Sequence, residues 1–139
     1  MMVVTRKIST NTRGDGHTID ITTEVEKAVR EADVGSGVVT LFVVGSTAGL
    51  TTLEFEPGAV ADLGRVFEQL APRDAEYQHE LRWHDDNGHS HVRAALLGPS
   101  LSVPFVSGKL VLGTWQQIVL VDFDTRPRKR DVVAQIMGE

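Results

Sequence analysis

The stretch Val38-Val39-Thr40-Leu41-Phe42-Val43-Val44 decides the fold of this chain. Seven consecutive apolar or β-branched residues, preceded by Gly35-Ser36-Gly37 and followed by Gly45, are typical of a central strand that is covered on both faces. The run is too short to cross a membrane, so it belongs to a soluble core. We therefore predict a sheet organised around residues 38–44.

The segments before this strand have clear local patterns. Met2–Ser9 and His17–Ile21 are rich in β-branched residues, and the Gly-containing segment between them predicts a β-hairpin. Residues 22–32 carry apolar side chains at helical spacing, with Thr23 and Glu26 placed as a capping box. The N-terminal third is thus predicted to be a hairpin followed by a helix.

The segments after the strand also have clear local patterns. Residues 59–70 predict a second helix, and we expect its apolar stripe to lie in the core: Val60, Leu63, Val66, Phe67 and Leu70. Ser107-Gly108 is a two-residue hairpin signal, and residues 118–124 and 131–137 read as strands. The fold class is α+β, with mixed, largely antiparallel sheets forming a sandwich and short helices packed on it. The 139 residues fit a single domain.

Composition excludes several classes of protein. The chain has no cysteine, which rules out disulfides, thiolate metal sites and a cysteine nucleophile. A net charge of −5 disfavours nucleic acid as a partner, and the one basic cluster, Arg126–Arg130, suits a small anion better than a duplex. The N-terminus lacks the apolar region of a signal peptide, so we expect a cytoplasmic protein with no membrane partner.

Potential chemistry is concentrated between Trp83 and Gly98, which contain three of the five histidines beside Asp85 and Asp86. Asp-Asp-Asn-Gly favours a turn, and the segment after it, Ser90–Leu97, is rich in helix formers. Gly98 and the proline after it would end that helix. A polar turn is therefore followed directly by the N-terminus of a helix, whose free backbone amides favour the binding of anions.

The spacing of two histidines restricts a metal site. Residues two apart diverge by about 200° on a helix but share a face on an extended segment. His89 and His91 can therefore bind one ion only if His89 precedes the helix. The alternative is a solvated loop without metal. On the strand at residues 50–56, Glu54 either projects toward a pocket or is a solvated carboxylate.

Three motifs carry a resemblance to a known family: Ser46–Glu54, Asp86–His91 together with Leu97–Ser100, and Gly113–Ile118. They resemble the YjbQ family of secondary thiamine-phosphate synthase-like proteins. The resemblance implies a small homotrimer whose histidine-lined, metal-binding pockets lie between subunits, with zinc or magnesium as the divalent cation. It also implies a modest transferase activity that joins a pyrimidine diphosphate to a thiazole phosphate and releases pyrophosphate.

The resemblance also assigns residues to roles. Those implied are Glu54, His91 and Arg128 in catalysis; Ser46, Thr47, Asn87, Arg128 and Arg130 in binding the phosphorylated metabolite; and His79 and His91 as metal ligands. The chain departs from the family at Gly45, where many members have a histidine. His89, two residues from His91, is the first candidate to replace that ligand.

Three functional hypotheses follow: a metal-dependent enzyme, a non-catalytic metabolite- or metal-binding trimer, and a scaffold in which the trimer itself is the function. Replacing Glu54 distinguishes the enzyme from the binding trimer, because only the enzyme needs Glu54 as an acid or base. Bound metal in a protein without catalytic turnover favours the scaffold. Trp115 fits either a subunit interface or the core of the chain.

Overall fold

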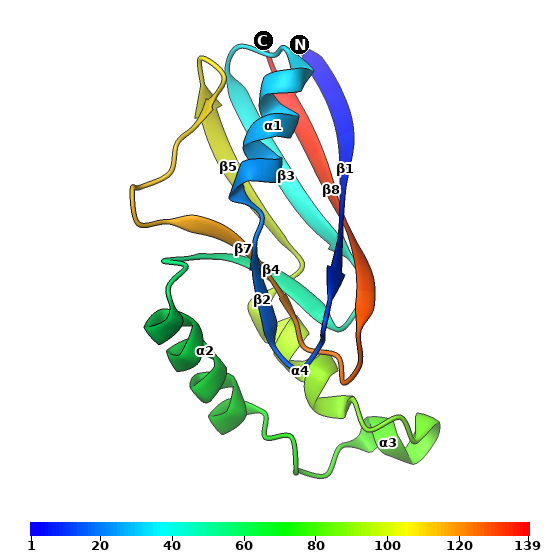
Figure 1. Ribbon diagram of the computed structural model, residues 1–139. Helices are drawn as coiled ribbons and strands as arrows, with labels where there is room; N and C mark the ends of the chain where they lie inside the picture. The colour runs from blue at the N-terminus through cyan, green and yellow to red at the C-terminus, as the bar shows by residue number, and fades with distance from the viewer.

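A computed structural model describes all 139 residues as two antiparallel sheets and four helices (Figure 1). The large sheet has the strand order β1-β8-β3-β5-β6 and the small sheet has the order β2-β7-β4. Every strand pair is antiparallel, so the largely antiparallel α+β fold is confirmed. The strands are β1 (Met2–Thr12), β2 (His17–Asp20), β3 (Gly37–Val44), β4 (Ala48–Leu53), β5 (Ser100–Val106), β6 (Lys109–Leu110), β7 (Gln117–Asp122) and β8 (Arg128–Gly138).

Strand β3 lies in the middle of the large sheet, as its apolar run predicts. Val39, Leu41 and Val43 are fully buried in the core between the sheets. Phe42 and Val44 on the opposite face are 47% and 56% exposed, so the expectation that both faces are covered is wrong for the single chain. No helix or second sheet of the chain covers the outer face of the large sheet at these residues.

Strand β7 is covered on both faces. Ile118 and Leu120 belong to the first core, which also contains the inner face of the large sheet and helix α1 (Thr22–Ala32). Val119 and Val121 point the other way, into a smaller second core with Ala94 and Phe67. This alternation follows from the period of two in a strand, and it makes β7 the wall between the two cores.

The predicted hairpin between β1 and β2 is wrong. Strand β1 pairs with β8 in the large sheet, whereas β2 pairs with β7 in the small sheet. The connecting residues Gly14, Asp15 and Gly16 all have positive φ, and they cross from one sheet to the other. A Cβ on Gly14 would lie 2.6 Å from the carbonyl oxygens of Asp124 and Arg126, so glycine allows this turn to lie against the β7–β8 turn.

Helix α1 forms where its apolar spacing predicts, and Val25, Ala28, Val29 and Ala32 are its buried residues. Its N-terminus is not the expected capping box. Asp20 accepts hydrogen bonds from the backbone N–H and hydroxyl of Thr22, at 2.9 and 2.6 Å. The helix therefore begins two residues earlier than a Thr23 cap would place it.

Helix α2 (Pro57–Leu70) corrects another expectation, because most of its apolar stripe is not core. Phe67 is buried against Phe123, with ring centroids 4.8 Å apart. Val66 and Leu70 are 38% and 64% exposed. The helix stands away from the sheets in Figure 1, so a single chain offers its stripe too little surface to pack against.

Helices α3 (Gln78–Trp83) and α4 (Gly88–Leu97) follow α2 and lie below the small sheet (Figure 1). Helix α4 packs along β4, and Ala94 enters the second core. It begins at Gly88, two residues earlier than the sequence suggests, and ends before Gly98, which has a φ of 97°. The early start determines where the histidines of α4 point.

The later connections are partly as expected. Ser107 and Gly108 form the predicted hairpin turn between β5 and β6, with φ of 50° and 75°. Trp115 is 74% exposed, which excludes the intradomain-core alternative for this residue. None of the four helices is both long and apolar enough to cross a bilayer.

Candidate functional site

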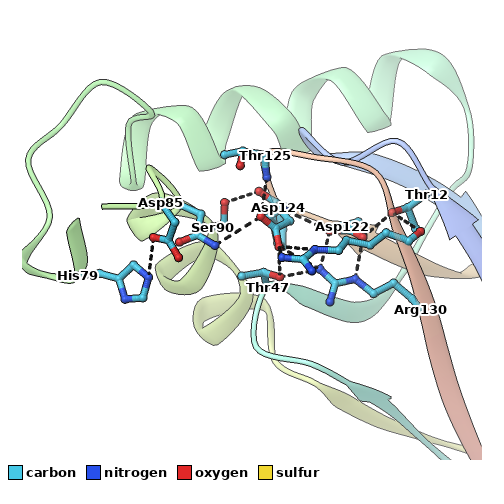
Figure 2. Close-up of polar contacts among 12 residues, drawn as sticks. Thr12, Thr47, His79, Asp85, Ser90, Asp122, Asp124, Thr125 and Arg130 are labelled. Carbon is cyan, nitrogen blue, oxygen red and sulfur yellow. Dashed lines mark hydrogen bonds and ion pairs between the residues drawn. The ribbon is translucent and has the colours of Figure 1, made fainter. Parts of the chain in front are cut away.

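A buried ion pair forms the floor of the candidate site. Alternation places Asp122 on the β7 face that looks toward the large sheet, and Arg130 lies on the inward face of β8. The Arg130 Nε and Nη2 groups donate to the two oxygens of Asp122 at 2.7 and 2.8 Å, as Figure 2 shows. Thr12 also donates to Asp122. Burial alone would raise the pKa of Asp122, but hydrogen bonds from Arg130 and Thr12 bring this pKa below its ordinary value.

Asp124, two residues further on, holds the second carboxylate of the floor. It accepts hydrogen bonds from Thr47 Oγ1 at 3.0 Å, Arg128 Nε at 2.9 Å and the Thr125 backbone N–H at 2.8 Å. Burial opposes ionisation of this carboxyl, but the hydrogen bonds outweigh it and lower the pKa of Asp124. Both carboxylates are therefore ionised at neutral pH, and both are occupied by protein donors.

Two imidazoles form the opposite wall. His79 from α3 and His91 from α4 have ring centroids 4.3 Å apart. His79 Nε2 lies 3.1 Å from Asp85 Oδ1 (Figure 2). Burial, and then the charge of His79, lower the pKa of His91. Two imidazoles this close together are suitable metal ligands, although no group of three or more histidine and carboxylate side chains in the chain has the geometry of a metal site.

Asn87 lies between the floor and the imidazole wall. In one orientation its amide nitrogen is 3.4 Å from Asp124 Oδ1. With the amide turned over, the nitrogen lies 2.8 Å from Asp85 Oδ1 and 3.0 Å from His79 Nε2. The second orientation gives better hydrogen bonds, so Asn87 orients the imidazole wall rather than the floor.

The floor and the imidazole wall line one open cavity of about 440 Å³. Its lining is almost entirely polar: Gly45, Ser46, Thr47, His79, Trp83, Asp85, Asn87, His91, Asp124, Arg128 and Arg130. A volume of this size matches a small-molecule site. The structure thus brings together seven of the predicted residues, namely Ser46, Thr47, His79, Asn87, His91, Arg128 and Arg130.

The YjbQ-like UPF0047 family model matches residues 6–139. The chain belongs to the YjbQ family. A UPF0047 protein of Archaeoglobus fulgidus is 40% identical over 119 residues, covering 86% of this chain and 90% of the relative. YugU of Bacillus subtilis is 35% identical and covers 99% of this chain and 100% of the relative. A YbjQ-like protein of unknown function from Sulfolobus solfataricus superimposes with a TM-score of 0.94 at 33% identity, over 99% of both chains.

His89 does not join the other two histidines. Because α4 begins at Gly88, His89 already lies on the helix, and the condition for sharing an ion with His91 is not met. Its side chain is buried beside Tyr77, with ring centroids 6.3 Å apart, in a separate cavity of about 540 Å³ that also contains Arg73 and Glu80. Within one chain, His89 therefore lies in a different cavity from His79, His91 and Gly45.

Glu54 also lies outside the cavity. Strand β4 pairs Ala48 with Asp122 at the site and ends at Leu53, so Glu54 is roughly 20 Å further along the chain at about 3.3 Å per residue. Its side chain is exposed. Within one chain of this YjbQ-family protein, Glu54 and His91 cannot act on the same atom.

Sequence reasoning missed Asp122 and Asp124, the residues that orient both arginines. The signal was present, because two acids alternate with an aromatic residue at the end of an otherwise apolar strand. Inward-facing acids at such a strand end need cationic partners, and Arg128 and Arg130 follow within eight residues. That pattern could have identified the floor of this YjbQ-family site.

Proposed function

We propose that the cavity binds a phosphorylated small molecule beside a divalent cation, zinc or magnesium, held by His79 and His91. The reaction we assign to it joins a pyrimidine diphosphate to a thiazole phosphate and releases pyrophosphate. The supporting observation is that the imidazole pair and the donors of Arg128 line the same cavity of about 440 Å³. The proposal includes a homotrimer in the cytoplasm, with no nucleic acid or membrane as partner.

The chemistry needs charge neutralisation on the leaving group. A bound divalent cation would supply part of it by contacting phosphate oxygens. Arg128 supplies the rest through the N–H groups that Asp124 does not occupy. His91 is neutral at pH 7 because its pKa is lowered, so its imidazole can either bind the cation or accept a proton.

Glu54 fits this reaction only if another subunit supplies it. Proton transfer by Glu54 would require its β4 end to lie against the cavity of a neighbouring chain. The exposed Trp115 and the bare outer face of the large sheet give the chain apolar surface for such contacts. A site shared between subunits would therefore reconcile the distance within one chain with a catalytic role for Glu54.

A non-catalytic trimer that binds a metabolite or a metal is the second candidate. It is favoured by the state of the two buried carboxylates. Asp122 and Asp124 are fully engaged with protein donors, so neither is free to act as a general acid or base. The donors of the cavity could hold a phosphate without any reaction following.

Metal analysis and a coupling assay test the proposal. Wild-type protein purified without chelator should retain a divalent metal, and His79→Ala and His91→Ala should lose it. His17→Ala is the matched control, because His17 lies on β2 and bonds only its own turn. Formation of thiamine phosphate by wild type but not by Glu54→Gln supports the enzyme. If wild type and Glu54→Gln bind the ligand equally and neither forms product, the result supports the non-catalytic trimer. Full metal retention in both histidine variants refutes the metal assignment.

A further inference from the structure

Arg130 has one nitrogen that the protein does not use. Its Nε and Nη2 bond Asp122, and Nη2 also donates to Thr47 Oγ1 at 2.6 Å. Nη1 has no hydrogen-bond partner in the chain, although the residue is only 7% exposed. Every fully buried side-chain nitrogen or oxygen in the structure has a hydrogen-bond partner. Because Nη1 has none, it is not fully buried, and solvent or a ligand reaches it through the cavity that Arg130 lines.

Gly45 is the reason that this nitrogen is open. A Cβ on residue 45 would lie 2.7 Å from Arg130 Nη1, a contact that side chains do not tolerate. The φ of Gly45 is 144°, a conformation that other residues rarely adopt. Only a glycine therefore leaves Nη1 facing the cavity with this backbone.

A second guanidinium lies beside the first. Asp124 Oδ2 is 2.8 Å from Arg128 Nη2 and 3.8 Å from Arg130 Nη2, so one carboxylate holds both arginines. Arg128 Nη1, like Arg130 Nη1, has no partner in the protein. Two fixed guanidinium groups with spare N–H donors are suited to a tetrahedral oxyanion, because guanidinium binds phosphate oxygens directionally and keeps its charge at all relevant pH values.

We propose that Gly45 determines the specificity of the cavity for phosphate ligands. It leaves Arg130 Nη1 free to donate a hydrogen bond to one oxygen of a terminal phosphate or diphosphate. Arg128 contacts a second oxygen of the same group. The proposal rests on the proposed function only in placing the ligand in this cavity, and it requires neither the cation nor the transfer reaction. Asp122 prevents Arg130 from turning, so the position of the phosphate is fixed before the ligand arrives.

Pyrophosphate is the probe, titrated by calorimetry into chelator-treated protein and again with magnesium present. Gly45→Ala places a methyl group against Nη1 and should lower the affinity at least about tenfold, since one charge-assisted hydrogen bond is lost. Gly108→Ala is the matched control. Gly108 also has positive φ, at 75°, but nothing lies within 4 Å of its added Cβ, so it tests backbone strain alone and should bind like wild type.

A crystal structure of wild-type protein with pyrophosphate makes the test independent of variant folding. An oxygen within hydrogen-bond distance of Arg130 Nη1 supports the proposal, and pyrophosphate seated elsewhere overturns it. Equal affinity in wild type and Gly45→Ala, or no binding by wild type at millimolar concentration, also overturns it. Protein that holds no metal as purified and shows no coupling activity would refute the proposed function. A tenfold difference between wild type and Gly45→Ala in that same protein would still support this inference.

Discussion

Arg130 and Asp122 form a two-point ion pair, at 2.7 and 2.8 Å, between the two sheets and directly beneath the cavity. Side-chain exposure is 8% for Arg130 and zero for Asp122. An ion pair removed from water in this way is costly to break, because the surviving partner becomes an uncompensated buried charge. The same contact therefore supports the fold and orients a binding group.

Asp122→Ala should lower the free energy of unfolding by about 3–5 kcal/mol, because it leaves the Arg130 guanidinium buried without its carboxylate. Urea denaturation followed by circular dichroism measures this change. Asp131→Ala is the control: Asp131, next to Arg130 on β8, accepts a hydrogen bond from Ser9 of β1 on the exposed face of the large sheet, so the midpoint should hardly move. Similar midpoints for the two variants would show that the buried pair does not support the fold.

Stability should fall in acid through Asp122 and Asp124. Both have lowered pKa values in the folded state, so the unfolded chain binds protons more readily. Their contribution is complete above the unfolded value of about 3.9 and is lost as pH falls below it toward the folded values. Unfolding free energies measured between pH 7 and pH 2 should show this loss, and Asp124→Asn should flatten the curve. A curve of unchanged slope in that variant would contradict the assignment.

Bound metal should be released on mild acidification. Protonated imidazole cannot bind a cation, and burial with a neighbouring histidine lowers the pKa of His91. The neutral ligand is therefore kept down to a pH below the ordinary histidine value of about 6.5. Zinc content after dialysis should be constant from pH 8 to about pH 6.5 and then decline. Retention of zinc at pH 4 would point to carboxylate ligands instead.

The chain should form a homotrimer through its exposed apolar surfaces. Trp115, Val111 and Leu70 are 74%, 55% and 64% exposed, and contact with a neighbouring chain would remove their apolar side chains from water. Light scattering should give three times the mass of one chain at micromolar concentration. Trp115→Glu should shift that mass downward, whereas Lys27→Glu on the exposed face of helix α1 should not. A wild-type monomer under these conditions would refute the trimer.

Mixed subunits can locate Glu54. If the carboxylate acts in a neighbour's cavity, Glu54→Gln and His91→Ala proteins should each be inactive alone. After joint unfolding and refolding, mixed trimers would contain some cavities with both native groups, and part of the coupling activity should return. Activity that stays absent in the mixture would indicate that both residues are needed in one chain, or that Glu54 has no part in the reaction.

Local patterns predicted most elements correctly, because α1, α2 and β3 depend on spacing within one segment. The pairing of β2 was not predictable in the same way. A Gly-Asp-Gly turn favours a hairpin locally, but β2 gains more by pairing with β7 and burying Ile19 and Ile21 near the first core. Partner choice of this kind depends on residues a hundred positions away.

The site was predictable in its composition but not in its arrangement. Resemblance pointed to His79, His91 and Arg128, which do share one cavity. The two-residue shift in the start of α4 reversed the expectation for His89, since a helix boundary is the least certain feature of a sequence pattern. The distance of Glu54 from the cavity of its own chain was not predictable for another reason: a single sequence shows which strand a residue belongs to or follows, but not which end of that strand meets the site.

Strand β7 separates the two cores and carries the site carboxylates at one end, which has a consequence for internal motion. Its amides are shielded by side chains on both faces and by a strand on each side, so they should exchange with deuterium only when the whole chain unfolds. Helix α3 has no buried residue and should exchange through small local openings. The arginine side of the cavity would then stay rigid while the His79 side opens and closes. A ligand could enter on the His79 side without displacing the arginines that bind its phosphate.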